Sequence, residues 1–192
     1  MNNIVTKEPI AETSQRPRAR ITGAVYLLYF LTAIFAAFLG TRHVAYGDAA
    51  NLIANAFYIV VTLLFYFLFK PVNRVLSLLA ACFSVVGCAI QTLSLYHLAS
   101  SRISPLLFFG PYCLLLGYLI FRSTFLPRFL GVLMGFAGLG WLIYLLPMAK
   151  HLSTYLEVLG IVAEGLLCLW LLVMGVNVPC WRKLASVVEG LQ

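Results

Sequence analysis

Long uncharged stretches alternate with short polar connections along most of this sequence. Six of them follow one another at residues 21–40, 49–69, 75–101, 103–121, 129–149 and 158–175, the last interrupted only by Glu164. An α-helix needs about 20 apolar residues to cross the roughly 30 Å of hydrocarbon in a bilayer. These runs are continuously apolar, whereas the strands of a transmembrane barrel alternate at every second residue. The pattern predicts an all-α polytopic membrane protein, a bundle of six transmembrane helices.

The composition agrees with this pattern. Of the 192 residues, 62% are hydrophobic and 10% are charged, and the mean hydropathy is +0.98. A soluble domain of this size needs more polar residues to cover its surface. The net charge is +7, but the basic residues are dispersed along the chain rather than gathered in one groove. Nucleic acid is therefore not expected as a partner.

The basic residues also orient the predicted helices, because cytoplasmic loops carry an excess of Lys and Arg. If the N-terminus is inside, the cytoplasmic side holds Lys7, Arg16, Arg18, Arg20, Lys70, Arg74, Arg122, Arg128, Arg182 and Lys183. The outer side holds Arg42, Arg102 and Lys150. We therefore expect both termini in the cytoplasm and the protein in a bacterial inner membrane. The expected divisions are a disordered tail at 1–17, the transmembrane domain at 18–177 and a short cytoplasmic tail at 178–192.

Polar and small residues fall on single faces of three predicted helices. In the second span they are Asn51, Asn55, Tyr58, Thr62 and Tyr66. In the third they are Ser77, Ser84, Cys88 and Gln91, and in the sixth Gly160, Glu164, Cys168 and Gly175. In lipid, such stripes mark faces turned toward other helices. They predict a bundle held by interhelical hydrogen bonds, the simpler interpretation, or a polar cavity between these spans. The candidates for such an inter-helix region are Glu164, Gln91, Asn51, Asn55 and Tyr58.

Glu164 is the one acidic residue inside a predicted span. A charged side chain near the middle of a membrane helix costs on the order of 3 kcal/mol on insertion scales. Two arrangements would reduce this cost: a protonated, neutral carboxyl group, or hydrogen bonds from the polar candidates or from a tyrosine. Intramembrane carboxylates serve as proton relays or cation sites, and a neutral Glu bonded between helices serves packing alone. Both interpretations stay open.

The three histidines, His43, His97 and His151, all fall on the predicted outer side. Three imidazoles could bind zinc and activate water in a membrane-embedded hydrolase. Their spacing matches no metal motif, so this enzyme hypothesis is an alternative to a non-catalytic role. The five cysteines include no Cys-x-x-Cys pair. We therefore expect no disulfide, no resident metal and no cofactor.

Other residues predict how the helices pack. The fifth span carries a seam of small residues: Gly131, Gly135 and Gly138. Pro111 predicts a kink or local unwinding in the fourth span. Trp141 suits an anchor at the outer membrane interface and Trp181 one at the inner interface.

Several short segments together resemble one family. They are RITGAVYLL at 20–28, GDAA at 47–50, KPVNR at 70–74, LGY at 116–118, FRS at 121–123, LPR at 126–128, LG at 130–131, Glu164, and LWLL at 169–172. The chain is similar over residues 18–177 to the bacterial integral membrane family catalogued as domain of unknown function 4386. The resemblance implies a small polytopic membrane protein and supplies no activity or substrate. It also implies a Phe-Arg pair where this chain has Phe83 and Ser84, so Glu164 would lack a counter-charge here.

The polar stripes and Glu164 favour binding or transport of a small molecule or lipid through the inter-helix region. The alternatives are the metal-dependent hydrolase and a non-catalytic subunit of a membrane complex. Membrane lipids are expected partners, and a homo-oligomer is compatible with the sequence.

Overall fold

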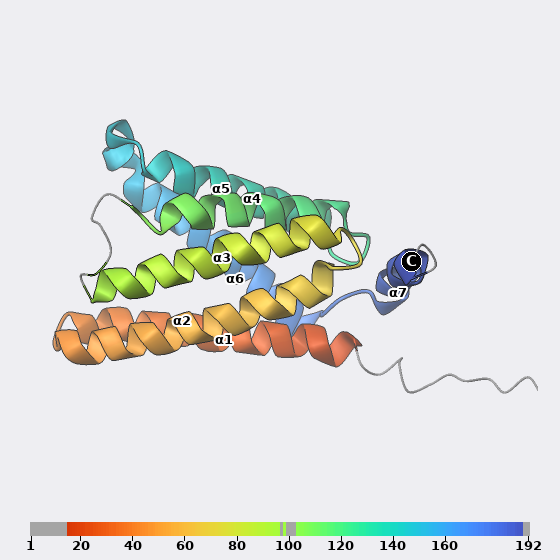
Figure 1. Ribbon diagram of the computed structural model, residues 1–192, viewed down its shortest axis with the longest axis horizontal. Helices are drawn as coiled ribbons and strands as arrows, with labels where there is room; N and C mark the ends of the chain where they lie inside the picture. The colour runs from red at the N-terminus through yellow and green to blue at the C-terminus, as the bar shows by residue number, and fades with distance from the viewer. Residues whose placement is uncertain (1–14, 97, 99–102, 190–192) are drawn as a thin grey trace, which may run out of the picture.

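A computed structural model describes residues 15–96, 98 and 103–189 of the chain (Figure 1). The described residues are all-α and contain no strand, which confirms the all-α part of the prediction. The elements are α1 (Gln15–Gly40), α2 (Val44–Phe69), α3 (Arg74–Leu95), α4 (Leu106–Arg122), α5 (Arg128–Tyr144), the 3-10 helix η1 (Pro147–Leu152), α6 (Ser153–Val173) and α7 (Val178–Glu189). Most of the predicted tail at 1–17 lies outside the described residues, and its last three residues begin α1.

Four helices of the described chain are long and apolar enough to cross a membrane: Pro17–Gly40 within α1, then α2, α3 and α6. The two other bundle helices, α4 and α5, have 17 residues each and are also apolar. At 1.5 Å per residue, each is about 26 Å long. Large apolar side chains cover the outside of the bundle, as in a protein surrounded by lipid. These helices fit an integral membrane protein with several spans.

The six helices α1 to α6 form a closed ring. Each packs against the next along the chain, and α6 packs against α1 to complete the circle. They run side by side along the long axis of the molecule, whereas α7 stands apart at one end (Figure 1). We call this end, which also holds the α2–α3 and α4–α5 turns, the α7 end. The opposite end holds the α1–α2 turn and η1 and is called the open end (Figure 1).

Glycine allows the closest helix contacts in the ring. A Cβ atom on Gly23 of α1 would lie 2.8 Å from the Cα atom of Leu172 in α6. Between α4 and α5, a Cβ on Gly131 would lie 2.6 Å from the backbone oxygen of Gly117. Neither space admits a methyl group without helix movement. The predicted seam of α5 is therefore in contact at Gly131 and Gly138, whereas a Cβ on Gly135 would meet nothing within 4 Å.

Several helix ends differ from the charge-free windows. The second helix begins at Val44 and includes Asp48, and the sixth begins at Ser153 and includes Glu157. A charged side chain near a helix end can reach water, so a helix can include a charged residue there. The position of the first charge therefore did not mark the helix end. The third and fifth helices end before their predicted windows do, at Leu95 and Tyr144. Tyr144 lies shortly before a proline, which disfavours helix in the preceding residue. The predicted unwinding at Pro111 is wrong, because α4 stays α-helical on both sides of this residue.

The α7 end is fastened by side-chain and backbone hydrogen bonds. The Asn73 side chain caps α3 by accepting a bond of 3.0 Å from the Leu76 backbone N–H. The Asn177 backbone N–H donates to the Phe125 oxygen in the α4–α5 turn at 3.1 Å. The Trp181 indole donates to the Leu68 backbone oxygen in α2 at 3.0 Å. The segment predicted as a short tail therefore forms a helix that is bonded to the bundle.

Candidate functional site

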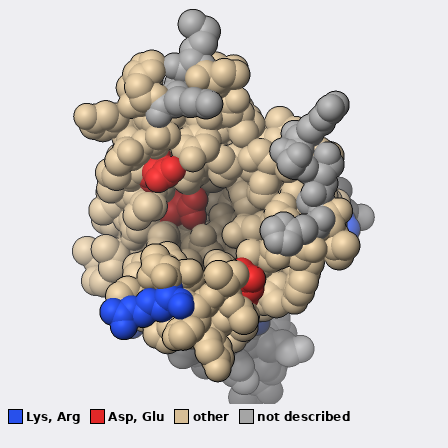
Figure 2. All heavy atoms as spheres, turned by 90° about the vertical axis from the view of Figure 1, so that its left-hand side faces the viewer, with Lys and Arg blue, Asp and Glu red and all other residues tan. Residues whose placement is uncertain are grey.

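The ring of helices encloses a cavity of about 320 Å³. Its lining residues come from all six bundle helices and from the residue before α4: Tyr29, Asn55, Tyr58, Gln91, Pro105, Leu106, Phe109, Trp141 and Glu164. Viewed from the open end, the molecule is hollowed at its centre, and an acidic side chain lies inside the hollow (Figure 2). Glu164 is the acidic residue among those that line the cavity. The cavity therefore holds a carboxyl group near the middle of the bundle and faces the open end.

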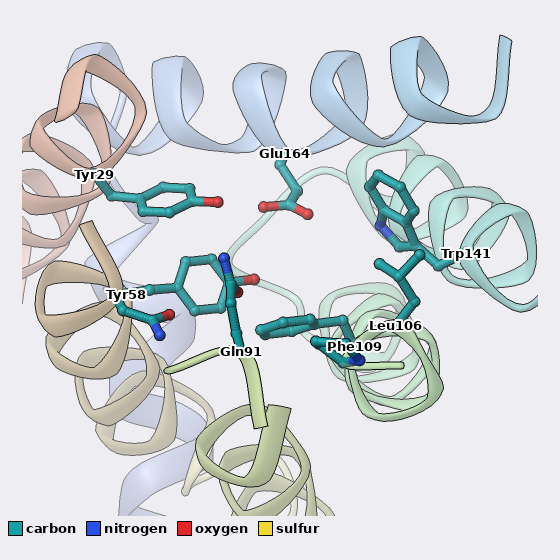
Figure 3. Close-up of a pocket in the computed structure, with 9 residues that line it drawn as sticks. Tyr29, Tyr58, Gln91, Leu106, Phe109, Trp141 and Glu164 are labelled. Carbon is teal, nitrogen blue, oxygen red and sulfur yellow. The ribbon is translucent and has the colours of Figure 1, made fainter. Parts of the chain in front are cut away.

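Glu164 is placed there by the buried face of α6. Gly160, Glu164, Cys168 and Leu171 recur at steps of four, four and three, which puts them on one helical face, and all are buried. Glu164 is the twelfth of the 21 residues of α6, so it lies about 16 Å from the start of this helix. Its side chain is 9% exposed and projects from α6 into the cavity (Figure 3).

A tyrosine from α1 supports the carboxyl group. The Tyr26 hydroxyl donates a hydrogen bond of 2.6 Å to Glu164 Oε2. The Tyr58 hydroxyl is a second hydrogen-bonding neighbour of this carboxyl group, which projects into the cavity (Figure 3). A tyrosine was one of the partners expected from the sequence, whereas Asn51, Asn55 and Gln91 do not bond to Glu164.

Aromatic rings form much of the cavity wall. Tyr29 and Tyr58 lie with ring centres 4.7 Å apart, and Phe109 meets Tyr58 edge to face at 5.5 Å. The Tyr29 hydroxyl points toward Glu164, and Trp141 lies on the other side of the carboxyl group (Figure 3). Trp141 packs over Gly160, where a Cβ would lie 2.8 Å from its Cε2 atom. The rings thus surround the carboxyl group from several helices.

The cavity is blocked toward the α7 end. Between α2, α3 and α4 only about 10 Å³ of space remains, with Thr62, Phe65 and Tyr112 among its lining residues. This is about the space of one water molecule. Thr62 and Ser84 share a hydrogen bond of 2.6 Å at this level. The buried side chains of Thr62, Phe65 and Tyr112 thus form a packed floor beneath the cavity.

Of the five candidates from the sequence, four line the cavity: Glu164, Gln91, Asn55 and Tyr58. The Asn55 amide nitrogen is already engaged, because it donates to the Cys88 backbone oxygen at 2.9 Å and to Thr92 Oγ1 at 2.8 Å. Asn51 is half-buried and not part of the lining; it lies one helical turn nearer the open end of α2. Asn55 thus acts in helix packing as well as in the wall.

Five lining residues were not candidates from the sequence: Tyr29, Pro105, Leu106, Phe109 and Trp141. Trp141 was expected at the outer membrane interface, and the structure places its side chain in the cavity wall, which the sequence did not predict. An apolar or aromatic residue in an apolar run gives no sign of whether it faces lipid or a cavity. The signal that could have located Trp141 is Gly160 on the face of Glu164, since a missing side chain makes room for a ring.

The histidines are not brought together within the described chain. His43 is the exposed residue before α2 and His151 is an exposed residue of η1, while His97 lies outside the described residues. No group of three His, Cys, Asp or Glu residues that could hold a metal ion occurs in the described part. All five cysteines are free.

Comparison with known proteins supports the resemblance found in the sequence. The family model described as "Domain of unknown function (DUF4386)" matches residues 43–103 and 102–175. A protein of Archaeoglobus fulgidus described as "Uncharacterized protein" is 32% identical over 137 residues, which cover 68% of this chain and 81% of that protein. No solved structure matches the chain. The relative is archaeal, so similar proteins are not confined to bacteria. The family model matches more than half of the chain, which therefore belongs to the family with the domain of unknown function DUF4386.

Proposed function

We propose that this protein crosses the membrane six times and binds a small molecule in the cavity beneath its outward-facing end. The single observation that carries the binding proposal is the cavity itself. Its volume of about 320 Å³ lies at the lower end of the roughly 300–1,000 Å³ of ligand pockets, and it has the apolar wall with a few polar groups that is typical of such sites. The floor beneath it favours binding over open conduction.

The six-span part of the proposal is supported by the ring. The helices α4 and α5 are short, but they pack between α3 and α6 and run alongside them (Figure 1). A helix of 17 residues is at the lower limit for crossing a bilayer. We therefore propose that residues 18–177 form one transmembrane domain, with 178–192 at the cytoplasmic surface.

The orientation is supported by the basic residues. Those of the described helix ends and turns at the α7 end are Arg18, Arg20, Lys70, Arg74, Arg122, Arg128, Arg182 and Lys183. The open end has Arg42 and Lys150. Because positive charge is retained in the cytoplasm, we place the α7 end inside and the cavity mouth outside, in the cytoplasmic membrane of the cell.

A cysteine introduced at Gln91 tests both the cavity and the orientation. Gln91 lines the cavity, and no hydrogen bond of its side chain would be lost in Gln91→Cys. Thiol reagents react with the thiolate, which forms in water and not in lipid. A membrane-impermeant methanethiosulfonate added to intact cells should therefore modify Gln91→Cys.

The matched control is Leu93→Cys on the same helix, since Leu93 is 43% exposed on the outside of the ring. This thiol would face lipid and should stay unmodified, as should the native cysteines of the unaltered protein. Modification of Gln91→Cys only after lysis would contradict the orientation. No modification in either condition would contradict the water-filled cavity.

The non-catalytic subunit is the alternative that the same protein sample can address. It predicts that a stoichiometric protein partner is extracted with this protein in mild detergent. It also predicts that small molecules do not change the rate at which the thiol of Gln91→Cys is modified. The metal-dependent hydrolase predicts zinc bound at one equivalent, which elemental analysis of the purified protein would detect.

A further inference from the structure

The chemical groups around the cavity define the class of ligand more closely than the cavity volume does. Its wall combines the Glu164 carboxyl group with the rings of Tyr29, Tyr58, Phe109 and Trp141. Of the residues described, none that line the cavity is Lys or Arg. The wall therefore offers a carboxyl group and aromatic faces, but no positive charge to pair with an ionised carboxylate.

The carboxyl group lacks a cationic partner inside the bundle. Its hydrogen-bonding neighbours are the neutral hydroxyl groups of Tyr26 and Tyr58. The basic residues of the described bundle helices lie in the first two turns or the last turn of a helix, others lie in the turns between helices, and Arg182 and Lys183 belong to α7, outside the ring. An ionised carboxylate in such surroundings is costly unless a positive charge pairs with it. The carboxyl group projects into the cavity, so a ligand there can supply that charge (Figure 3).

The rings add a second attraction for the same charge. A cation within about 6 Å of an aromatic ring centre is attracted to the negative face of the ring, and aromatic cages use this to bind alkylammonium groups. Tyr58 stands between Tyr29 and Phe109, with ring centres 4.7 Å and 5.5 Å away. A cation next to Glu164 would therefore lie among several rings drawn from α1, α2, α4 and α5.

Other ligand classes fit the cavity less well. An anion would be repelled by an ionised Glu164, and an apolar molecule would leave the carboxylate without a positive charge in a dry site. A bare metal ion needs several hard ligands, and no group of three His, Cys, Asp or Glu residues occurs in the described part of the chain. An organic ammonium group satisfies the carboxylate through one charge and the rings through its alkyl groups.

We infer that the cavity recognises a small organic ammonium group, held by the Glu164 carboxylate and enclosed by the aromatic wall. This inference rests on the proposed function, because it requires that the cavity be open to water. The ammonium group has two possible sources, a free amine in the external solution or the headgroup of an aminophospholipid.

The Gln91→Cys protein provides the test. Three methanethiosulfonates of similar size are compared, one with a trimethylammonium group, one neutral and one with a sulfonate. Each modification rate is divided by that of a small free thiol, which removes the intrinsic reactivity of the reagent. We expect the cationic reagent to exceed the sulfonate by about tenfold or more, because a nearby unit charge acts with opposite sign on the two. In Gln91→Cys with Glu164→Gln, this preference should fall to near one.

Binding of the probe is then measured by protection. Choline is added before the cationic reagent, and 3,3-dimethyl-1-butanol, which has the same shape without the charge, serves as its control. Choline should slow modification of Gln91→Cys and the neutral alcohol should not. Phe109→Leu should weaken choline protection by about threefold or more. The matched change Phe108→Leu should leave it unaltered, since Phe108 pairs with Phe83 away from the cavity lining.

Lipid discs separate the two sources. If an aminophospholipid headgroup occupies the cavity, modification is slower in discs of phosphatidylethanolamine than in discs of phosphatidylglycerol, even without choline. If a free amine is the ligand, the two discs give the same rate and choline protects in both. Either result supports ammonium recognition.

The two proposals fail in different ways. If no reagent modifies Gln91→Cys in any preparation, the open cavity is wrong and the proposed function fails. If all three reagents react at equal normalised rates, and neither choline nor phosphatidylethanolamine protects, the cavity is open but the ammonium inference is overturned.

Discussion

The contact between α4 and α5 allows a prediction with a built-in control. A Cβ atom on Gly131 would lie 2.6 Å from the Gly117 oxygen and 2.7 Å from the Phe121 nitrogen, and both are backbone atoms. Ordinary contacts between carbon and oxygen are about 3.3–3.6 Å. In Gly131→Ala the two helices must therefore separate locally by about 0.7–1 Å, because neither backbone atom can rotate away.

The expected cost follows from this separation. Overpacking of a close contact typically costs about 1–3 kcal/mol, and a gap of this size forfeits about a quarter to a half of the dispersion energy of neighbouring atom pairs. In Gly135→Ala the added methyl group meets nothing within 4 Å, and alanine is the better helix former by up to about 1 kcal/mol. We expect Gly131→Ala to be less stable than Gly135→Ala by about 2 kcal/mol.

The assay is thermal unfolding of both variants in the same detergent, followed by the helical circular dichroism signal. For a chain of this size, 2 kcal/mol corresponds to about 4–8 °C in the melting temperature. Equal melting temperatures, or a higher one for Gly131→Ala, would refute the reasoning that this contact sets the distance between α4 and α5.

Three further predictions concern hydrogen bonds that join or end helices. Tyr26→Phe should lower the free energy of unfolding by about 1.5–3 kcal/mol, as expected for a bond to a charged group. A double-mutant cycle with Glu164→Leu, whose side chain cannot accept the bond, should give a coupling of at least about 0.5 kcal/mol in denaturant titrations, and strict additivity would contradict the bond. Asn73→Ala should cost about 1 kcal/mol through loss of the α3 cap, measured by the same titration, and an unchanged midpoint would count against the cap. Trp181→Phe should lower the free energy of unfolding by about 0.5–1.5 kcal/mol and speed protease cleavage in α7. An unchanged cleavage rate would show that the bond to the Leu68 oxygen does not hold α7.

The sequence predicted the helical class and much of the cavity lining for a simple physical reason. Polar groups in lipid must face protein or water, so Tyr58, Gln91 and Glu164 could be assigned to the interior. Helix ends were less well predicted. The charge-free windows left out Asp48 and Glu157, yet both residues lie inside helices.

The closed ring could not be predicted from single helices. It depends on which faces of α1 and α6 meet, and this is decided by the space at Gly23 and by the bond from Tyr26 to Glu164. In the first span, neither Gly23 nor Tyr26 belongs to a polar stripe that is long enough to stand out. The place of Trp141 in the cavity wall was missed for the related reason that a tryptophan suits an interface and a cavity wall equally well.

The fastening at the α7 end has a mechanical consequence for the whole ring. Bonds from Asn177 and Trp181 tie the C-terminal segment to the α4–α5 turn and to α2, and Arg20 donates to the Val173 oxygen at 3.3 Å, tying α1 to α6. A ring clamped at one rim can widen only by splaying its helices about that rim. We expect a bulky guest to be accommodated by tilting at the opposite rim, while the spacing among the clamped turns changes little.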